Sequence, residues 1–374
     1  MKDVFKRLSA EGVSVWLDDI SRDRLDSGSL AHLVETGRVT GVTSNPTIFE
    51  QALTSGSAYR EQLAGLAGRG VRAEEAVREL TTHDIRRACD ELAGVHRRTS
   101  GRDGLVSIEV DPRKARDAAA TVAEARALWR AVDRPNLLIK IPATVESLPA
   151  VAACLAEGIG VNVTLIFSTD RYREVTGVFL DGMERARAAG LDVSRIASVA
   201  SFFVSRLDTA VDGRLAAVSS PEARAMSGRS AVANARLAYQ VYEESLASAR
   251  WRALAAAGAR PQRLLWASTG VKNPDYRDTL YVEELVAPDT VNTMPEATLN
   301  AVGDHAEICG DRVRRHYAVS RRVLDYLPWF GISYDAVVSS LETAALDAFV
   351  GSWEALLETV ERELDAHRLV SAAR

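Results

Sequence analysis

Short apolar runs alternate with longer helical segments along almost the whole chain. Eight of these runs are rich in Val, Ile, Leu, Phe and Trp and carry few charges, a composition typical of β-strands buried on both faces. The predicted strands cover residues 13–18, 41–45, 105–110, 136–144, 160–167, 196–204, 263–269 and 289–295. Between them, Ala, Leu, Glu and Arg recur at helical spacing, which predicts helices over residues 21–37, 46–96, 112–132, 145–157, 170–189 and 231–257.

Eight strands separated by helices favour a closed parallel barrel, the (β/α)8 or TIM barrel. The alternative is an open doubly wound sheet, which more often carries a glycine-rich phosphate turn after its first strand. The chain has no such turn, because the segment Asp18-Asp-Ile-Ser-Arg22 lacks the spacing GxGxxG, and no GxxxxGK[ST] occurs elsewhere. The barrel is therefore the predicted fold.

The last part of the chain predicts helices outside the barrel. We expect the barrel over about residues 12–309 and a C-terminal helical appendage over about residues 310–374. The segment Leu327-Pro-Trp-Phe-Gly331 should interrupt these helices, and residues 353–369 form an acidic amphipathic segment at the end. Since no flexible linker or low-complexity tract occurs, the whole chain, residues 1–374, is predicted to be a single domain.

Composition and charge exclude several classes of function. A formal net charge of -5 and a pI near 5.8 give no basic surface for nucleic acid. No run of 18 apolar residues predicts a membrane span, and no apolar segment follows the charged N-terminus as in an export signal. Three widely spaced cysteines and six histidines without ligand spacing predict reduced thiols and no metal site. We therefore expect a cytoplasmic protein, either a monomer or a homodimer, since nothing in the sequence decides between these.

Lys140 is an ionisable residue in the middle of an apolar strand, Leu137-Leu-Ile-Lys140-Ile141. Only five of the 46 basic residues are lysines and the other 41 are arginines, so the chain uses arginine wherever a general cation suffices. A desolvated lysine can lose its proton and attack a carbonyl, whereas an arginine cannot. Lys140 is therefore the candidate Schiff-base nucleophile. The alternative is a lysine at a strand end whose ammonium group reaches solvent.

Polar residues stand at or near the ends of the other predicted strands. Because the carboxyl ends of barrel strands surround one pocket, these side chains should meet there: Asp18, Asn45, Glu109, Lys140, Asn162, Thr164, Ser201 and Ser268. An iminium at Lys140 would withdraw electrons from the neighbouring carbon–carbon bond, which is aldol or retro-aldol chemistry. Two carboxylates, Glu109 and Asp18, suit proton transfer, and the amides and hydroxyls suit a sugar. Some of these residues could instead be helix caps.

Six motifs together resemble those of the transaldolases, in the same order and on the same strands, between about residues 12 and 300. They are Val15-Trp-Leu-Asp18, Gly41-Val-Thr-Ser-Asn45-Pro-Thr, Ser107-Ile-Glu109-Val-Asp, Leu138-Ile-Lys140-Ile-Pro-Ala-Thr, Val161-Asn162-Val-Thr164-Leu-Ile-Phe-Ser and Ala200-Ser201-Phe-Phe203-Val-Ser-Arg206. The resemblance implies a (β/α)8 barrel of the class I aldolase type, with no cofactor and no metal.

The resemblance also implies roles for single residues. Lys140 would form the Schiff base, Glu109 would act as acid and base with Thr164 holding its water, and Asp18 would take the hydroxyl proton in the cleavage step. The dihydroxyacetone portion of the substrate would be bound by Asn45, Asn162 and Ser201. Phosphate recognition is expected after the sixth and seventh strands, from Arg206 and from the loop Ser268-Thr-Gly-Val-Lys272. The family usually has a closely spaced Ser-x-Arg where this chain has Ser268 and Lys272, and Lys272 could also be a solvated loop charge.

The implied activity is transfer of a dihydroxyacetone unit in the pentose phosphate pathway. The donor would be sedoheptulose 7-phosphate or fructose 6-phosphate, and the acceptor glyceraldehyde 3-phosphate or erythrose 4-phosphate. One alternative is an aldolase that releases dihydroxyacetone to water. Related aldolases have tyrosine at the position of Phe203, and the apolar ring here favours transfer. The other alternative is a non-catalytic sugar-phosphate-binding barrel, which the presence of Lys140, Glu109 and Asp18 disfavours.

Overall fold

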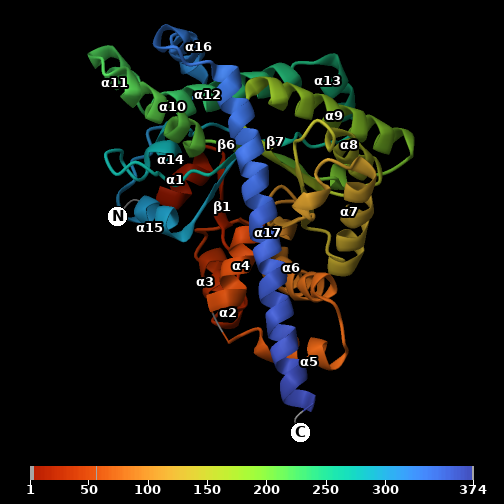
Figure 1. The fold of residues 1–374 in the computed structure, drawn as a ribbon. Coiled ribbons are helices and arrows are strands. Elements are labelled where there is room, and N and C mark those ends of the chain that lie inside the picture. The colour runs from red at the N-terminus through yellow and green to blue at the C-terminus, as the bar shows by residue number, and fades with distance from the viewer. Residues whose placement is uncertain (1–3, 56, 373–374) are drawn as a thin grey trace.

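The computed structural model, which describes residues 4–55 and 57–372, confirms the predicted barrel. Within these residues eight parallel strands pair in chain order, and β8 closes the barrel against β1 (Figure 1). The strands are β1 (Val13–Asp18), β2 (Gly41–Thr43), β3 (Val106–Glu109), β4 (Leu137–Pro142), β5 (Val161–Ile166), β6 (Ser198–Phe203), β7 (Arg263–Ala267) and β8 (Thr290–Met294). Their ends lie within two residues of the predicted ends, because apolar runs bounded by turn residues are a strong local signal.

Helices surround the barrel and form the predicted outer layer. They are α1 (Val4–Ala10), α2 (Arg22–Asp26), α3 (Ser29–Glu35), α4 (Pro46–Ser55), α5 (Arg60–Gly68), α6 (Ala73–Arg98), α7 (Ala118–Val132), α8 (Leu148–Ala156), α9 (Thr169–Ala188), α10 (Ser205–Val218), α11 (Pro221–Met226), α12 (Ser230–Leu246), α13 (Ala249–Ala256), α14 (Leu280–Glu284), α15 (Glu296–His305), α16 (Tyr317–Asp325) and α17 (Tyr334–Ala372). Four 3-10 turns complete the described elements: η1 (Pro112–Lys114), η2 (Val193–Arg195), η3 (Arg314–His316) and η4 (Leu327–Phe330).

Four of the predicted helical stretches were wrong in extent. The stretch 21–37 contains α2 and α3, with Gly28 between them at a left-handed φ of 73°, and the stretch 112–132 contains η1 and α7. The stretch 46–96 contains three helices, α4, α5 and α6, and Gly70 in the turn between α5 and α6 has a left-handed φ of 68° that a continuous helix cannot contain. The stretch 231–257 contains α12 and α13. There Ser248 has an extended backbone, and its hydroxyl accepts from the Trp251 amide as the cap of α13. Helical spacing of apolar residues continues across these breaks, so it does not reveal them.

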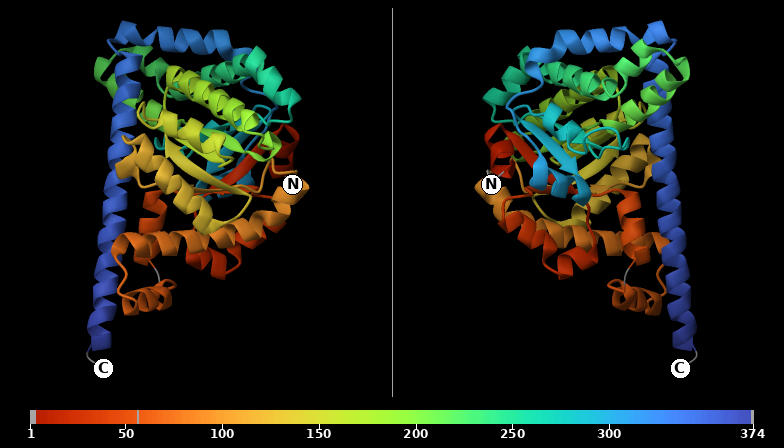
Figure 2. Two further views of the ribbon diagram at one scale, coloured as in Figure 1. Left: turned by 90° about the vertical axis from the view of Figure 1, so that its right-hand side faces the viewer. Right: turned by 90° about the vertical axis from the view of Figure 1, so that its left-hand side faces the viewer.

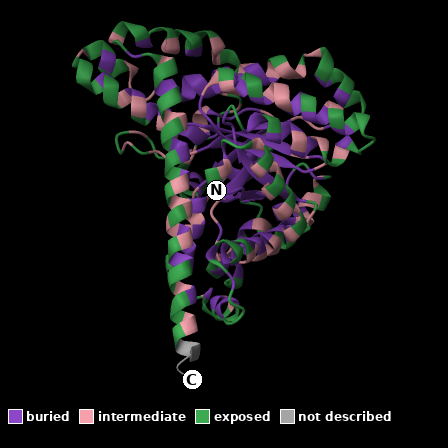
Figure 3. Cartoon of the chain, turned by 45° about the vertical axis from the view of Figure 1, so that its right-hand side comes forward, coloured by how far each residue is buried: buried purple, intermediate pink, exposed green. Residues whose placement is uncertain are grey.

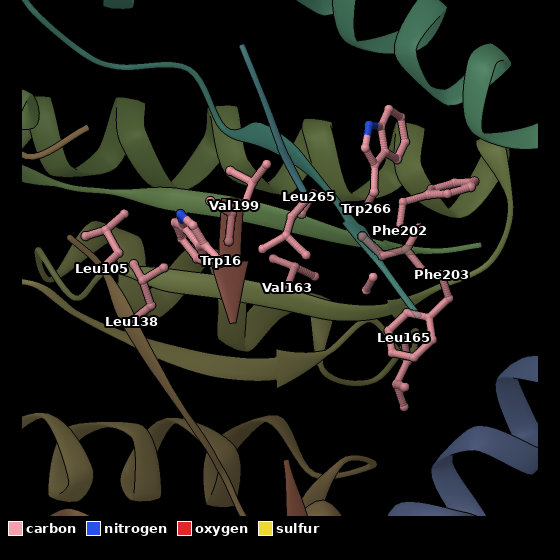
Figure 4. Packing of buried hydrophobic residues seen from close by; sticks show 14 of the residues in the cluster. Trp16, Leu105, Leu138, Val163, Leu165, Val199, Phe202, Phe203, Leu265 and Trp266 are labelled. Atoms are coloured by element: carbon pink, nitrogen blue, oxygen red, sulfur yellow. The ribbon is translucent and has the colours of Figure 1, made fainter. Parts of the chain in front are cut away.

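The barrel interior is filled by apolar side chains from alternate strand positions. Trp16 lies in the barrel with Leu138, Val199 and Leu265, all of them essentially without solvent contact (Figure 4). Burial is concentrated in the strands, and exposed residues lie on the outer faces of the helices (Figure 3). The barrel is thus a packed core that holds the ends of its strands in fixed positions.

A long C-terminal helix is the main addition to the barrel. The helix α17 has 39 residues and runs across the molecule against α4, α5, α6 and α10 (Figures 1 and 2). The predicted acidic segment 353–369 is its second half. The predicted break at 327–331 is confirmed, since η4 ends at Gly331 with a left-handed φ of 71°. None of the helices in the described ranges is both long and apolar enough to cross a membrane.

Candidate active site

Lys140 lies inside the barrel near the carboxyl end of β4 and is only 4% exposed. Its Nζ donates a 2.9 Å hydrogen bond to the carbonyl oxygen of Ser44 and lies 3.6 Å from Glu109 Oε1. The ring of Phe349, from the distant helix α17, has its centroid 5.9 Å from the same Nζ. The alternative of a side chain that reaches solvent is therefore excluded, and Lys140 is a buried amine beside a carboxyl group.

Glu109 ends β3 directly opposite Lys140 in the parallel register. It is 5% exposed, and burial raises the pKa of its carboxyl group to about 7, although the nearby charge of Lys140 acts in the opposite direction. Within the described residues, neither of its carboxyl oxygens has a hydrogen-bond partner. A carboxyl group with a pKa near neutral can both give and take a proton, as general acid–base catalysis requires.

Asp18 ends β1, close enough to Lys140 and Glu109 to influence their charges. Its Oδ1 accepts a 2.7 Å hydrogen bond from Thr43 Oγ1, and the Thr43 hydroxyl lies 2.6 Å from the hydroxyl of Thr293. Since the single proton of Thr43 points to the carboxylate, Thr293 donates to Thr43. Burial raises the pKa of Asp18, while Lys140 and the hydrogen bond from Thr43 lower it. The two threonines thus hold one carboxyl oxygen and leave the second for a ligand.

A pocket of about 380 Å³ opens at the carboxyl ends of the strands. Its described lining includes eight of the predicted site residues: Asp18, Asn45, Lys140, Ser201, Phe203, Arg206, Ser268 and Lys272. A second pocket of about 280 Å³ lies behind it, lined by Asn45, Glu109, Trp353 and the η1 turn. Asn45 borders both pockets. The predicted convergence of the strand ends is therefore found in the structure.

Asn162 is buried behind the pocket and does not line it within the described residues. Its Oδ1 accepts a 2.7 Å hydrogen bond from Ser201 Oγ, and its Nδ2 donates at 3.0 Å to Ser107 Oγ. Ser201 therefore presents its hydroxyl oxygen to the pocket in a fixed orientation. The Asn45 side chain caps α4, since its Oδ1 accepts from the Ile48 amide at 3.0 Å. Asn45 is therefore both a helix cap and a residue of the pocket lining, although the sequence presented these two roles as alternatives.

The far end of the pocket is basic. The guanidinium of Arg206 lies over the ring of Phe203, 5.5 Å from its centroid, and burial lowers its pKa. It has no carboxylate partner in residues 4–55 and 57–372. Ser268 lies opposite, with its hydroxyl 3.0 Å from that of Ser205 and a left-handed φ of 56°. Lys272 is exposed at the rim. A partly desolvated guanidinium without a carboxylate partner in the described residues, in a pocket that Ser268 also lines, is suited to a phosphate group.

Comparisons with known proteins match the whole barrel and most of α17. A model of the transaldolase/fructose-6-phosphate aldolase family matches residues 15–360. The chain belongs to this family. A transaldolase from Thermobifida fusca (strain YX) is 62% identical over 98% of this chain and 100% of its own length. Transaldolases from Acidothermus cellulolyticus and Saccharopolyspora erythraea are 59% and 58% identical, over 98% and 96% of this chain and 99% and 97% of their own lengths.

The sequence analysis did not predict several of the residues that lie at this pocket. Thr43 could have been found from the sequence, because it is two residues before Asn45 in the predicted strand 41–45, and residues two apart on a strand face the same side. Thr293, at the end of β8, could be found in the same way. Phe349 could not, since an aromatic residue in a long amphipathic helix is usually part of the core.

The backbone of β5 next to Thr164 was also unexpected. The register between β5 and β6 shifts after Val163, and Leu165 has a left-handed φ of 60°. This bulge bends the strand at Thr164, whose buried hydroxyl has no hydrogen-bond partner in the described part of the chain. A branched residue in this conformation is strained, and such strain is typical of functional sites.

Proposed function

We propose that the protein transfers a dihydroxyacetone unit from a ketose phosphate to an aldose phosphate through a Schiff base on Lys140. The ketose is of the sedoheptulose 7-phosphate or fructose 6-phosphate type, and the acceptor of the glyceraldehyde 3-phosphate or erythrose 4-phosphate type. One observation supports this most directly: the buried Lys140 amine lies 3.6 Å from Glu109, whose pKa is raised to about 7. The names of the relatives support the same activity.

Schiff-base formation needs a proton carrier beside the amine. Lys140 attacks the ketone carbon, and the resulting carbinolamine loses its hydroxyl as water when that oxygen is protonated. Glu109 carries this proton, because its pKa of about 7 leaves both forms populated at neutral pH. A water held between Glu109 and Thr164 would pair with their buried oxygens and carry the proton across the gap.

Carbon–carbon cleavage needs a base at the substrate hydroxyl on the carbon that leaves. Asp18 accepts the proton of the substrate hydroxyl through the carboxyl oxygen that Thr43 does not hold, and the bond electrons move into the iminium to form an enamine. The first aldose phosphate then leaves. In the second half-reaction the enamine attacks the new aldehyde, Asp18 returns the proton to the new hydroxyl, and water releases the product from Lys140.

The remaining predicted residues suit substrate binding. Asn45 and Ser201 border the pocket near Lys140 and present polar atoms to the dihydroxyacetone hydroxyls, and Asn162 holds Ser201 in place. The substrate phosphate binds at Arg206 and Ser268, with Lys272 as an outer cation. Phe203 keeps that side of the pocket apolar, which favours transfer over release to water. Release of dihydroxyacetone in an assay without acceptor measures the competing aldolase activity.

We also infer a single domain over residues 1–374 and a cytoplasmic location. The contacts of α17 with α4, α5 and α6 support the single domain. Cys89, Cys154 and Cys309 are free thiols, which supports a reducing compartment. The proposed chemistry uses side chains alone, without a cofactor or metal. The binding partners are small sugar phosphates.

Trapping the Schiff base tests the proposal. Borohydride added together with fructose 6-phosphate should reduce the imine to a stable amine on Lys140, found by peptide mass mapping. Lys140→Arg keeps the charge and removes the nucleophile, so it should give no adduct and no transfer. Lys6→Arg is the matched control, because Lys6 is exposed on α1 and lines neither of the two pockets, and this variant should keep its activity. An adduct on any other lysine, or turnover by Lys140→Arg, would refute the assignment.

A further inference from the structure

The helix α17 brings one aromatic ring into the substrate pocket. Phe349 is 5% exposed, lines the pocket together with Lys140 and Phe203, and lies with its ring 5.9 Å from Lys140 Nζ. Phe203 comes from strand β6 and Phe349 from a helix almost 150 residues later in the sequence. Figure 1 shows how α17 runs across the barrel. The reactive nitrogen therefore has an apolar ring on the side facing α17.

Polar contacts on both sides of Phe349 hold this part of α17 in place. Ser352, three residues later, has its hydroxyl 2.7 Å from that of Thr47 in α4, which also lines the pocket. Glu342, two turns earlier, forms an ion pair with Arg171 at 3.4 Å. At the start of the helix, the Tyr334 hydroxyl donates a 2.7 Å hydrogen bond to Asn234 Oδ1. The ring is thus positioned by contacts to three other helices and not by its own packing alone.

The proposed reaction makes a special demand at this position. After the first product leaves, the enamine on Lys140 must persist until an aldehyde arrives. If water protonates the enamine carbon, the hydroxide formed adds to the iminium carbon and the carbon–nitrogen bond breaks. Dihydroxyacetone is then released, and Lys140 regains its free amine. A side chain with no exchangeable proton, placed against the nitrogen, keeps water from this path. The face of an aromatic ring also attracts the positive charge of the iminium.

We propose that Phe349 is the residue of α17 that determines specificity for transfer over hydrolysis, an inference that rests on the proposed function. It acts by covering the Lys140 nitrogen and excluding water from the enamine. The C-terminal helix is then part of the active site, and its role is to protect the intermediate between two substrates.

Two substitutions at position 349 test this role. Phe349→Ala removes the ring and opens the pocket, and Phe349→Leu keeps an apolar side chain but loses the ring face. The measured quantity is the rate of dihydroxyacetone release from fructose 6-phosphate without acceptor, divided by the rate of transfer to erythrose 4-phosphate. This ratio should rise about tenfold in Phe349→Ala, equivalent to ~1.4 kcal/mol between the two paths, and by a smaller factor in Phe349→Leu.

A matched control separates this role from general stability. Phe179 is equally buried but lies on α9 against Trp251, with ring centroids 6.3 Å apart, and outside the pocket lining. Phe179→Leu should lower the melting temperature as Phe349→Leu does and leave the ratio unchanged. An unchanged ratio in Phe349→Leu, with normal transfer, would refute the inference alone, even if Phe349→Ala does not fold. A wild-type protein that forms no adduct on Lys140 would refute the proposed function and the inference with it.

Discussion

Replacing Glu109 by glutamine should change the pH dependence of stability in a calculable way. Burial raises the pKa of Glu109 from 4.5 to about 7, so the native state keeps a proton that the unfolded state has lost throughout this interval. Stability from this group is therefore present below pH 4.5 and is lost as the pH rises through 7. The pKa shift contributes roughly 3 kcal/mol to the free energy of unfolding in total. Roughly 2–3 kcal/mol of this contribution is lost between pH 5 and pH 8.

Glutamine cannot ionise, so the Glu109→Gln variant does not lose this part of its stability as the pH rises. The unfolding free energy of the variant minus that of the wild type should rise by roughly 2–3 kcal/mol between pH 5 and pH 8. Urea unfolding of both proteins at several pH values measures this difference. The same substitution should reduce kcat by roughly 10²–10⁴-fold, since it removes a general acid–base group.

The control is a glutamate outside the site. Glu91 is exposed on α6, and Glu91→Gln removes one surface carboxylate without touching the pocket. Its stability difference from the wild type should stay nearly constant with pH. The reasoning about Glu109 is wrong if Glu109→Gln behaves like this control, or if its difference falls with rising pH. The second result would mean that the carboxylate is stabilised in the folded protein.

Two further predictions concern the phosphate end and the barrel wall. Arg206→Ala should raise KM for fructose 6-phosphate by roughly 10–100-fold, which corresponds to the loss of a charge-assisted hydrogen bond. Lys272→Ala should raise KM less, because Lys272 is exposed. Equal effects of the two variants on KM would contradict the assignment of Arg206 as the main phosphate ligand. Gly41→Ala should destabilise the fold by about 1–3 kcal/mol in thermal unfolding, since a Cβ there would lie 2.5 Å from the Trp16 ring. Gly65→Ala, with open space around it in α5, should instead stabilise by about 0.5–1 kcal/mol, and a loss of stability there would show the helix argument to be wrong.

Part of the candidate site could be predicted because strand ends carry their own signal. In a parallel barrel, residues at the carboxyl ends of the strands surround one pocket whatever the loops do. Lys140, Asp18 and Ser201 were therefore placed correctly from the pattern of the strands alone. The same pattern predicted that Asn162 also lines the pocket, whereas in the structure it lies behind Ser201 and bonds to it. That difference depends on the direction of side chains within a packed layer, which alternation does not describe.

The sequence alone determined the eight strands and the barrel, and it singled out Lys140 as the candidate reactive amine. These follow from local properties, namely the apolar runs, their spacing and a rare lysine among arginines. Only the tertiary structure decided the raised pKa of Glu109 and the presence of Phe349 beside Lys140. Both depend on which groups surround a side chain in three dimensions. Burial at a given position, and the path of a helix that begins almost 200 residues after Lys140, are properties of the whole packed chain.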